Sequence, residues 1–169
     1  MTRFSLNRLR LRPGEEHRDH VLVELEPFDL GGQRYLPVPP QAPSELTVTR
    51  ATSGDVLLLR FATRLHGPCM RCLGDAVLDL SVDAREYNDS DARAPEELHS
   101  EYVSEGMVDL TRWARDALAE RLPDQILCRP DCAGLCPVCG KDLNVEPHEH
   151  PETVGDPRWA ALEELRDRL

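Results

Sequence analysis

Six cysteines in short, repeated spacings constrain the fold of this chain more than any other feature of its 169 residues. Cys69 and Cys72 are separated by two residues, as are Cys136 and Cys139, and a glycine follows each pair within two residues. Two thiolates at this spacing can bind one metal ion, while the glycine lets the backbone turn beneath the sulfur atoms. Because two such pairs occur far apart in one sequence, they indicate metal binding much more strongly than either pair alone.

The two remaining cysteines leave the choice of ligands open, because a structural zinc site needs only four. Our leading prediction joins the two pairs in a zinc-ribbon site with the ligands Cys69, Cys72, Cys136 and Cys139. A compact alternative uses only the cysteines of the C-terminal cluster, Cys128, Cys132, Cys136 and Cys139. A third set combines the first pair with the start of that cluster, Cys69, Cys72, Cys128 and Cys132.

All three sets predict a structural Zn²⁺, since a catalytic zinc keeps one coordination position open and usually has histidine or glutamate among its ligands. His148 and His150 stand in a polar, proline-flanked segment, so we interpret them as solvent-exposed residues rather than ligands. A dithiol redox role for some of the cysteines is an alternative, although no βαβ pattern surrounds either pair.

Acidic residues dominate the chain, which has a net charge of −11. Residues 88–106 carry six acids and one arginine, and residues 145–169 carry seven acids and three arginines. This balance excludes nucleic-acid binding through bulk charge, because phosphate contacts need clustered lysine and arginine. The N-terminal arm is a local exception that contains no acid, and its arginines are candidate RNA-binding residues: Arg3, Arg8, Arg10 and Arg12.

Alternating apolar residues predict antiparallel strands in the first half of the chain. The clearest are residues 56–65 and 77–87, and the first cysteine pair lies between them. We therefore predict a hairpin that carries this pair at its tip. Shorter strands are predicted at 21–25 and 46–50, whereas residues 27–45 are rich in proline and glycine and predict a long loop.

One main helix is predicted from Asp109, whose side chain can cap the first turn. Apolar residues recur at three- and four-residue spacing from Leu110 to Leu122, and Pro123 ends the pattern. A second amphipathic segment, residues 157–169, begins with a proline that suits a first helical turn.

Together these elements predict an α+β fold with a small antiparallel β-sheet, hairpins, one main helix and a cysteine-rich, zinc-ribbon-like site. We expect a single domain over residues 1–144, interrupted by the acidic segment 88–106 as a solvated loop. Residues 145–169 are predicted to form a flexible acidic linker that ends in the short amphipathic helix.

No motif typical of an enzyme is present in the sequence: we find no glycine-rich phosphate loop, no G-x-S-x-G elbow and no H-E-x-x-H helix. Ligand sets made only of cysteine favour a structural role, so we predict a protein that is not an enzyme and has no small-molecule substrate.

No apolar run reaches the length of a membrane span, and the first residues lack the apolar core of a signal peptide. We therefore expect a cytoplasmic location without membrane contact.

Four motifs occur in a distinctive order: C-M-R-C-L at 69–73, V-D-L at 108–110, L-C-R-P-D-C-A-G-L-C-P-V-C-G-K-D-L-N at 127–144 and D-P-R-W-A-A-L at 156–162. In this order they resemble the YceD family, the large ribosomal RNA subunit accumulation proteins, over about residues 56–169. The resemblance implies that all six cysteines fall on family positions. It also implies a non-enzymatic role in the accumulation or processing of large-subunit ribosomal RNA, and hence in ribosome assembly.

The partner implied by this resemblance is a precursor of the large ribosomal subunit, contacted through a ribosomal protein, through ribosomal RNA or through both. Two other functions remain as alternatives. One is a thiol-based redox or metal-sensing protein, in which some of the cysteines change their oxidation state or their bound metal. The other is a zinc-ribbon accessory protein of transcription.

Overall fold

The computed structural model describes residues 1–150, and the predicted terminal helix at 157–169 lies outside the described residues. The chain divides into a first unit, Met1–Cys132, and a second unit that begins at Ala133. All the strands and helices named below belong to the first unit.

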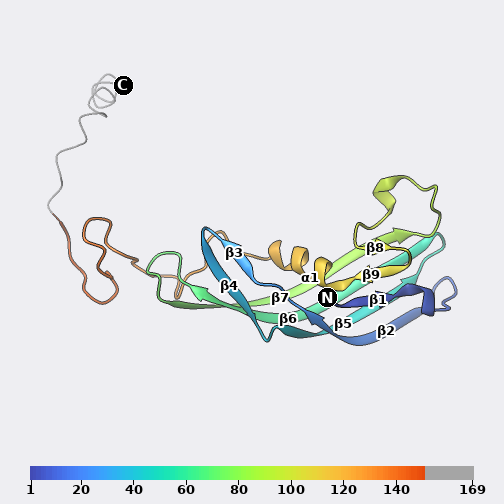
Figure 1. Cartoon of the computed structure of the whole chain (residues 1–169), viewed down its shortest axis with the longest axis horizontal. Helices are drawn as coiled ribbons and strands as arrows, with labels where there is room; N and C mark the ends of the chain where they lie inside the picture. Colours follow the sequence, from blue (N-terminus) through green and yellow to red (C-terminus); the bar gives the residue numbers. More distant parts are fainter. Residues whose placement is uncertain (151–169) are drawn as a thin grey trace, which may run out of the picture. The chain divides into compact units, whose positions relative to one another are not determined.

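A six-stranded antiparallel sheet forms the centre of the first unit (Figure 1). Its strands are β2 (Glu16–Glu24), β3 (Phe28–Leu30), β4 (Gln33–Val38), β5 (Gln41–Arg50), β6 (Gly54–Pro68) and β7 (Asp75–Asp89). The central strand is β6, which pairs with β7 along its whole length and with β5 and β4 along successive parts. Strands β2 and β3 complete the order β2-β5-β6-β4-β3.

A smaller antiparallel sheet contains β1 (Arg3–Ser5), β8 (Val103–Ser104) and β9 (Met107–Asp109), in the order β1-β9-β8. Two short 3-10 helices, η1 (Leu6–Arg8) and η2 (Glu96–Leu98), lie in the connections, and one α-helix, α1 (Leu110–Ala119), follows β9 directly. The predicted α+β class, with an antiparallel sheet and one main helix, is confirmed. Among the described residues, no helix has the length and apolar character required to cross a bilayer.

The long hairpin of β6 and β7 confirms the prediction of two strands around the first cysteine pair. Its ladder runs from Gly54 opposite Asp89 to Pro68 opposite Asp75, so both strands extend beyond their predicted bounds. Alternate residues of β6 face the core, and Leu57, Leu59 and Leu65 are fully buried there. The strict period-two pattern is what made this hairpin predictable.

Helix α1 begins as predicted, because the carboxylate of Asp109 accepts a hydrogen bond of 3.1 Å from the backbone N–H of Arg112. The apolar face of the helix packs against β2 and β7. Leu110, Trp113 and Leu118 on this face are almost completely buried and join the main core. Burying three large side chains, each contributing about 1.5–3 kcal/mol, holds this ten-residue helix on the sheet.

The prediction of a long loop at 27–45 is wrong, because this stretch contains β3, β4 and the start of β5. Gly31 and Gly32 have φ angles of 57° and 78°, which allow a two-residue turn between the paired ends of β3 and β4. Pro37 and Pro43 each lie where their strand has a ladder partner on one side only, and such edge-like positions accept a residue that has no N–H. Segment 88–106 also contains more structure than predicted, including η2, β8 and the buried Ser100.

Candidate metal centres

Four cysteine side chains of the first unit meet at the tip of the β6–β7 hairpin. Cys69 and Cys72 belong to the turn between the two strands, while Cys128 and Cys132 belong to the segment that follows α1. All four sulfur atoms lie within 4.8 Å of one another. We call this group the tip cluster.

The distances within the tip cluster match those expected around one tetrahedral metal ion. Cys69 Sγ lies 3.8 Å from Cys132 Sγ, and Cys72 Sγ lies 3.7 Å from Cys128 Sγ. Four sulfur atoms bound to zinc at about 2.3 Å are separated from one another by about 3.8 Å. A disulfide would instead bring two sulfurs to about 2.0 Å, and all six cysteines are free thiols. The four residues therefore fit a thiolate-bound metal ion.

Backbone donors around the hairpin turn favour the thiolate form of Cys69. The N–H of Arg71 points at Cys69 Sγ from 3.5 Å, and the turn is closed by a 2.7 Å bond from Cys69 N–H to the carbonyl of Gly74. Burial raises the pKa of the Cys69 thiol, but N–H donors from Cys72, Arg71 and Cys128 outweigh it and lower the pKa to about 6. Desolvation and the neighbouring sulfurs raise the pKa of Cys128 to about 12. All four side chains can therefore be thiolates together only when a cation balances their charge.

The hairpin tip is fixed to the segment that follows α1. The backbone N–H of Met70 donates to the carbonyl of Ile126 at 2.9 Å, and Ile126 is itself buried. The side chain of Arg71 donates to the carbonyl of Cys132 at 3.1 Å and to Gln125 at 3.3 Å. These bonds hold the two halves of the tip cluster in register.

Tyr35 on β4 contacts the two residues that precede the cysteine turn, Gly67 and Pro68. Its ring is fully buried, and its hydroxyl donates to the carbonyl of Pro68 at 2.8 Å, one residue before Cys69. The ring lies against Gly67, where a Cβ atom would come within 2.3 Å of ring carbon Cδ1. Only glycine therefore fits at this position of β6.

A second group of possible ligands lies in the second unit and combines two cysteines with two histidines: Cys136, Cys139, His148 and His150. Their ligand atoms also lie within 4.8 Å of one another. The N–H groups of Cys139 and Val138 are the main reason that the pKa of Cys136 falls to about 6, and His148 contributes to the shift. We call this group the tail cluster.

The structure therefore divides the predicted zinc-ribbon set between the two clusters, with Cys69 and Cys72 in one and Cys136 and Cys139 in the other. The tip cluster contains the four cysteines of the third predicted set. From the sequence, we preferred to interpret His148 and His150 as solvent-exposed residues because their segment is polar and rich in proline, whereas the structure groups both with a cysteine pair as possible ligands. Their two-residue spacing, nine residues after Cys139, was the signal that pointed to them.

The arginines of the N-terminal arm lie on β1, on η1 and in the residues that follow. All four side chains are exposed, and none forms an ion pair with an acid among residues 1–150: Arg3, Arg8, Arg10 and Arg12. Their charges therefore face solvent, as a nucleic-acid contact requires.

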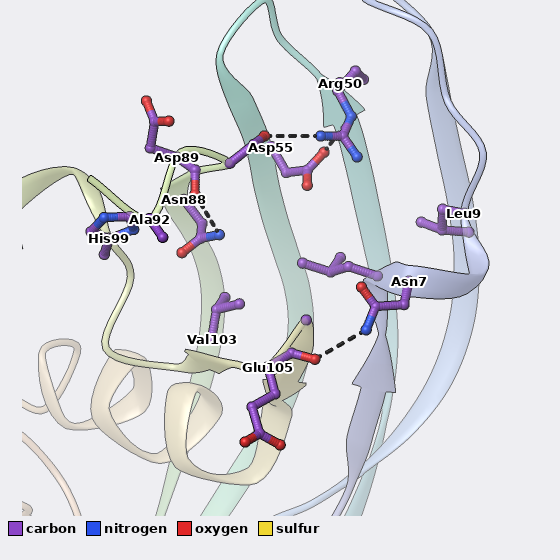
Figure 2. A pocket seen from close by; sticks show the side chains of 13 residues that line it. Asn7, Leu9, Arg50, Asp55, Asn88, Asp89, Ala92, His99, Val103 and Glu105 are labelled. Atoms are coloured by element: carbon purple, nitrogen blue, oxygen red, sulfur yellow. Dashed lines mark hydrogen bonds and ion pairs between the residues drawn. The ribbon is translucent and has the colours of Figure 1, made fainter. Parts of the chain in front are cut away.

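A cavity of about 630 Å³ lies at the open end of the β6–β7 hairpin, beside η1 and β8 (Figure 2). Arg50 and Asp55 form an ion pair of 3.1 Å at its wall, and Arg50 also donates to Ser90 at 3.1 Å. Across the cavity, the side chain of Asn7 donates to the carbonyl of Glu105 at 3.0 Å (Figure 2). Because these polar groups bond to one another, we interpret the cavity wall as a structural link between segments.

The fold and the clusters define a class of protein: an antiparallel β-sheet protein whose longest hairpin carries a four-cysteine group able to hold a metal ion. The chain belongs to the family described as large ribosomal RNA subunit accumulation protein YceD, whose model matches residues 57–166. The matched region includes the long hairpin except the first three residues of β6, together with α1 and all six cysteines. The predicted family is therefore confirmed.

Two relatives illustrate the range of similarity. The uncharacterized protein Rv2926c of Mycobacterium tuberculosis is 36% identical over 126 residues, which are 72% of this chain and 60% of the relative. The uncharacterized protein YlbN of Bacillus subtilis is 29% identical over 117 residues, which are 67% of this chain and 62% of the relative. The chain thus spans about three fifths of the length of these relatives. No solved structure matches it.

Proposed function

We propose that this chain is a non-enzymatic ribosome-assembly factor that supports the accumulation or processing of large-subunit ribosomal RNA. Membership of the YceD family supports the ribosomal role. The observation that carries the scaffold role is the tip cluster, which joins four cysteines and includes no histidine or carboxylate, the ligands typical of a catalytic zinc. A closed set of four thiolates stabilises a shape and leaves no coordination position for a substrate.

The metal ion that best suits the tip cluster is Zn²⁺, bound by Cys69, Cys72, Cys128 and Cys132. Tetrahedral sites with four sulfur ligands favour zinc or iron–sulfur centres, and the sulfur separations of 3.7 and 3.8 Å suit a single zinc ion. Binding would join the hairpin turn to a segment more than fifty residues later in the chain. Zinc would therefore stabilise the folded state through closure of this long loop.

The proposed partner is a precursor of the large ribosomal subunit. A chain with a net charge of −11 is suited to contact a basic ribosomal protein. The arginines of the N-terminal arm, which are exposed and form no ion pair with the described acids, are suited to contact RNA phosphates directly. We propose that Arg3, Arg8, Arg10 and Arg12 provide this contact.

Co-sedimentation tests the ribosomal role. Tagged chain in cells is expected to travel with large-subunit precursors on a sucrose gradient, and its deletion is expected to lower the amount of large-subunit ribosomal RNA relative to small-subunit RNA. Normal subunit profiles in the deletion strain, together with absence of the chain from the precursor fractions, would contradict the proposal.

Replacing all four arm arginines by glutamine is expected to weaken the association with precursors and to reduce its dependence on salt. Each lost phosphate contact lowers the slope of log affinity against log salt by about 0.7–0.9. A control variant, R34Q/R60Q/R64Q/R85Q, removes the same charge from exposed positions of the large sheet. Equal losses in the two variants would show that net charge, and not the arm, determines binding.

A further inference from the structure

We propose that the tail cluster is a second metal site, which binds one zinc-class divalent cation through Cys136, Cys139, His148 and His150. This site is additional to the proposed function, because neither the zinc at the hairpin tip nor the ribosomal role requires it. Two thiolates and two imidazoles are a complete set of ligands for a tetrahedral zinc.

The ligand atoms of the tail cluster already converge. Cys139 Sγ lies 3.1 Å from His148 Nε2, and the rings of His148 and His150 meet edge to face with their centroids 4.9 Å apart. A sulfur and a nitrogen bound to one tetrahedral zinc are separated by about 3.5 Å. The four donors are therefore close enough to share one ion.

A backbone contact orients His148 for metal binding. Its Nδ1 lies 2.7 Å from the carbonyl of Glu146, which can only accept a hydrogen bond. Nδ1 therefore carries the proton, and the lone pair of Nε2 faces Cys139. Histidine ligands of metals commonly make this bond to a carbonyl or carboxylate through the ring nitrogen that does not bind the metal. A histidine that served only as a solvated surface residue would not need this orientation.

The backbone of the second unit is shaped around its cysteine pair. Gly140 donates to the carbonyl of Cys136 at 2.8 Å, and Cys136 donates to the carbonyl of Lys141 at 2.8 Å. The φ angle of 73° at Gly140 lets the chain reverse beneath the sulfur atoms. Leu135 and Asp142 then form an isolated antiparallel bridge that closes the turn.

Apolar burial cannot account for this shape. Among residues 133–150, only Gly134 and Cys136 are buried, while Val138 and Val145 are 66% and 81% exposed. A segment of this length without an apolar core needs a cross-link or a metal to stay folded. The tail cluster provides the ligands for such a metal.

The test is a count of bound zinc by native mass spectrometry, on the full chain purified in the presence of a weak chelator. Wild-type protein is expected to hold two zinc ions. The H148A/H150A variant is expected to hold one, as is C136S/C139S. A matched control, H20A/H66A, removes two exposed histidines outside both clusters and is expected to keep two ions.

Cobalt substitution gives a second readout that does not depend on the fold of the cysteine variants. With six thiolates bound in wild-type protein and four in H148A/H150A, sulfur-to-cobalt absorption is expected to fall by about one third. If H148A/H150A holds as many ions as wild type, the second site is overturned. If wild type holds one ion and H148A/H150A holds none, the second site is supported and the zinc proposed at the hairpin tip is overturned instead.

Discussion

Replacing Cys69 by serine is expected to remove the ion from the tip cluster and to destabilise the first unit on the order of 4 kcal/mol or more. Loss of a structural metal is one of the few mechanisms by which a single substitution has so large an effect. Cys69 is fully buried, so its replacement also leaves a hydroxyl among the remaining sulfurs without a metal to bind. The measurement is urea unfolding of the zinc-loaded protein in a Trp159→Phe background, followed by the fluorescence of the buried Trp113.

Cys139→Ser is the matched control for this prediction. Cys139 belongs to the tail cluster, so its loss is expected to leave the unfolding of the first unit unchanged. Removing zinc from wild-type protein with a strong chelator should reproduce the effect of Cys69→Ser. An unchanged unfolding midpoint in both the chelated protein and the Cys69→Ser variant would contradict a metal at the hairpin tip. A reversible disulfide in metal-free protein would favour the redox alternative.

Replacing Gly67 by alanine is expected to destabilise the first unit by about 1–3 kcal/mol and to weaken zinc binding at the tip. The new Cβ would lie 2.3 Å from Cδ1 and 2.7 Å from Cε1 of the buried Tyr35 ring. The ring cannot move outward without breaking its hydrogen bond to Pro68, directly before Cys69. Strain at Gly67 is therefore transmitted to the cysteine turn. Thermal unfolding and competition for zinc with a coloured chelator measure the two effects.

A double-mutant cycle with Tyr35→Ala identifies the cause. Because the clash involves the ring, Gly67→Ala is expected to cost much less in the Tyr35→Ala background than in wild type. For the unfolding measurement, Gly74→Ala is a control on the same turn, since a Cβ there would meet Cys72 Sγ at an ordinary 3.4 Å and no ring atom. Strictly additive losses in the cycle would show that Gly67 has another role.

The hairpin and the main helix were predictable because their signals are local. Leu57, Leu59 and Leu65 follow the period of a strand, and Asp109 marks the start of the helix by capping it. Strands β3 and β4 were missed because the Gly31–Gly32 turn and the prolines were interpreted as loop residues. Whether a proline breaks a strand depends on its neighbours in the sheet, which the sequence does not specify.

Which cysteines lie together was not predictable from spacing, because three combinations of the six cysteines have the spacing of a four-ligand site. The path of the chain after α1 determines which cysteines meet. The bond between Met70 and the carbonyl of Ile126 brings Cys128, two residues later, to the hairpin tip. Cys136 lies beyond this point and joins the histidines of its own unit. Such a contact between distant segments has no signature in the local sequence.

The central claim is that one metal ion, bound only by sulfur, fixes the tip of the long hairpin. Zinc K-edge X-ray absorption of the H148A/H150A variant tests it most directly. This variant keeps the four cysteines of the tip cluster and removes the two histidines of the tail cluster, so the spectrum reports on zinc at the hairpin tip. The expected spectrum contains four sulfur neighbours at about 2.3 Å and no nitrogen or oxygen in the first shell. A first shell that includes nitrogen or oxygen, or a protein that retains no zinc, would contradict the claim.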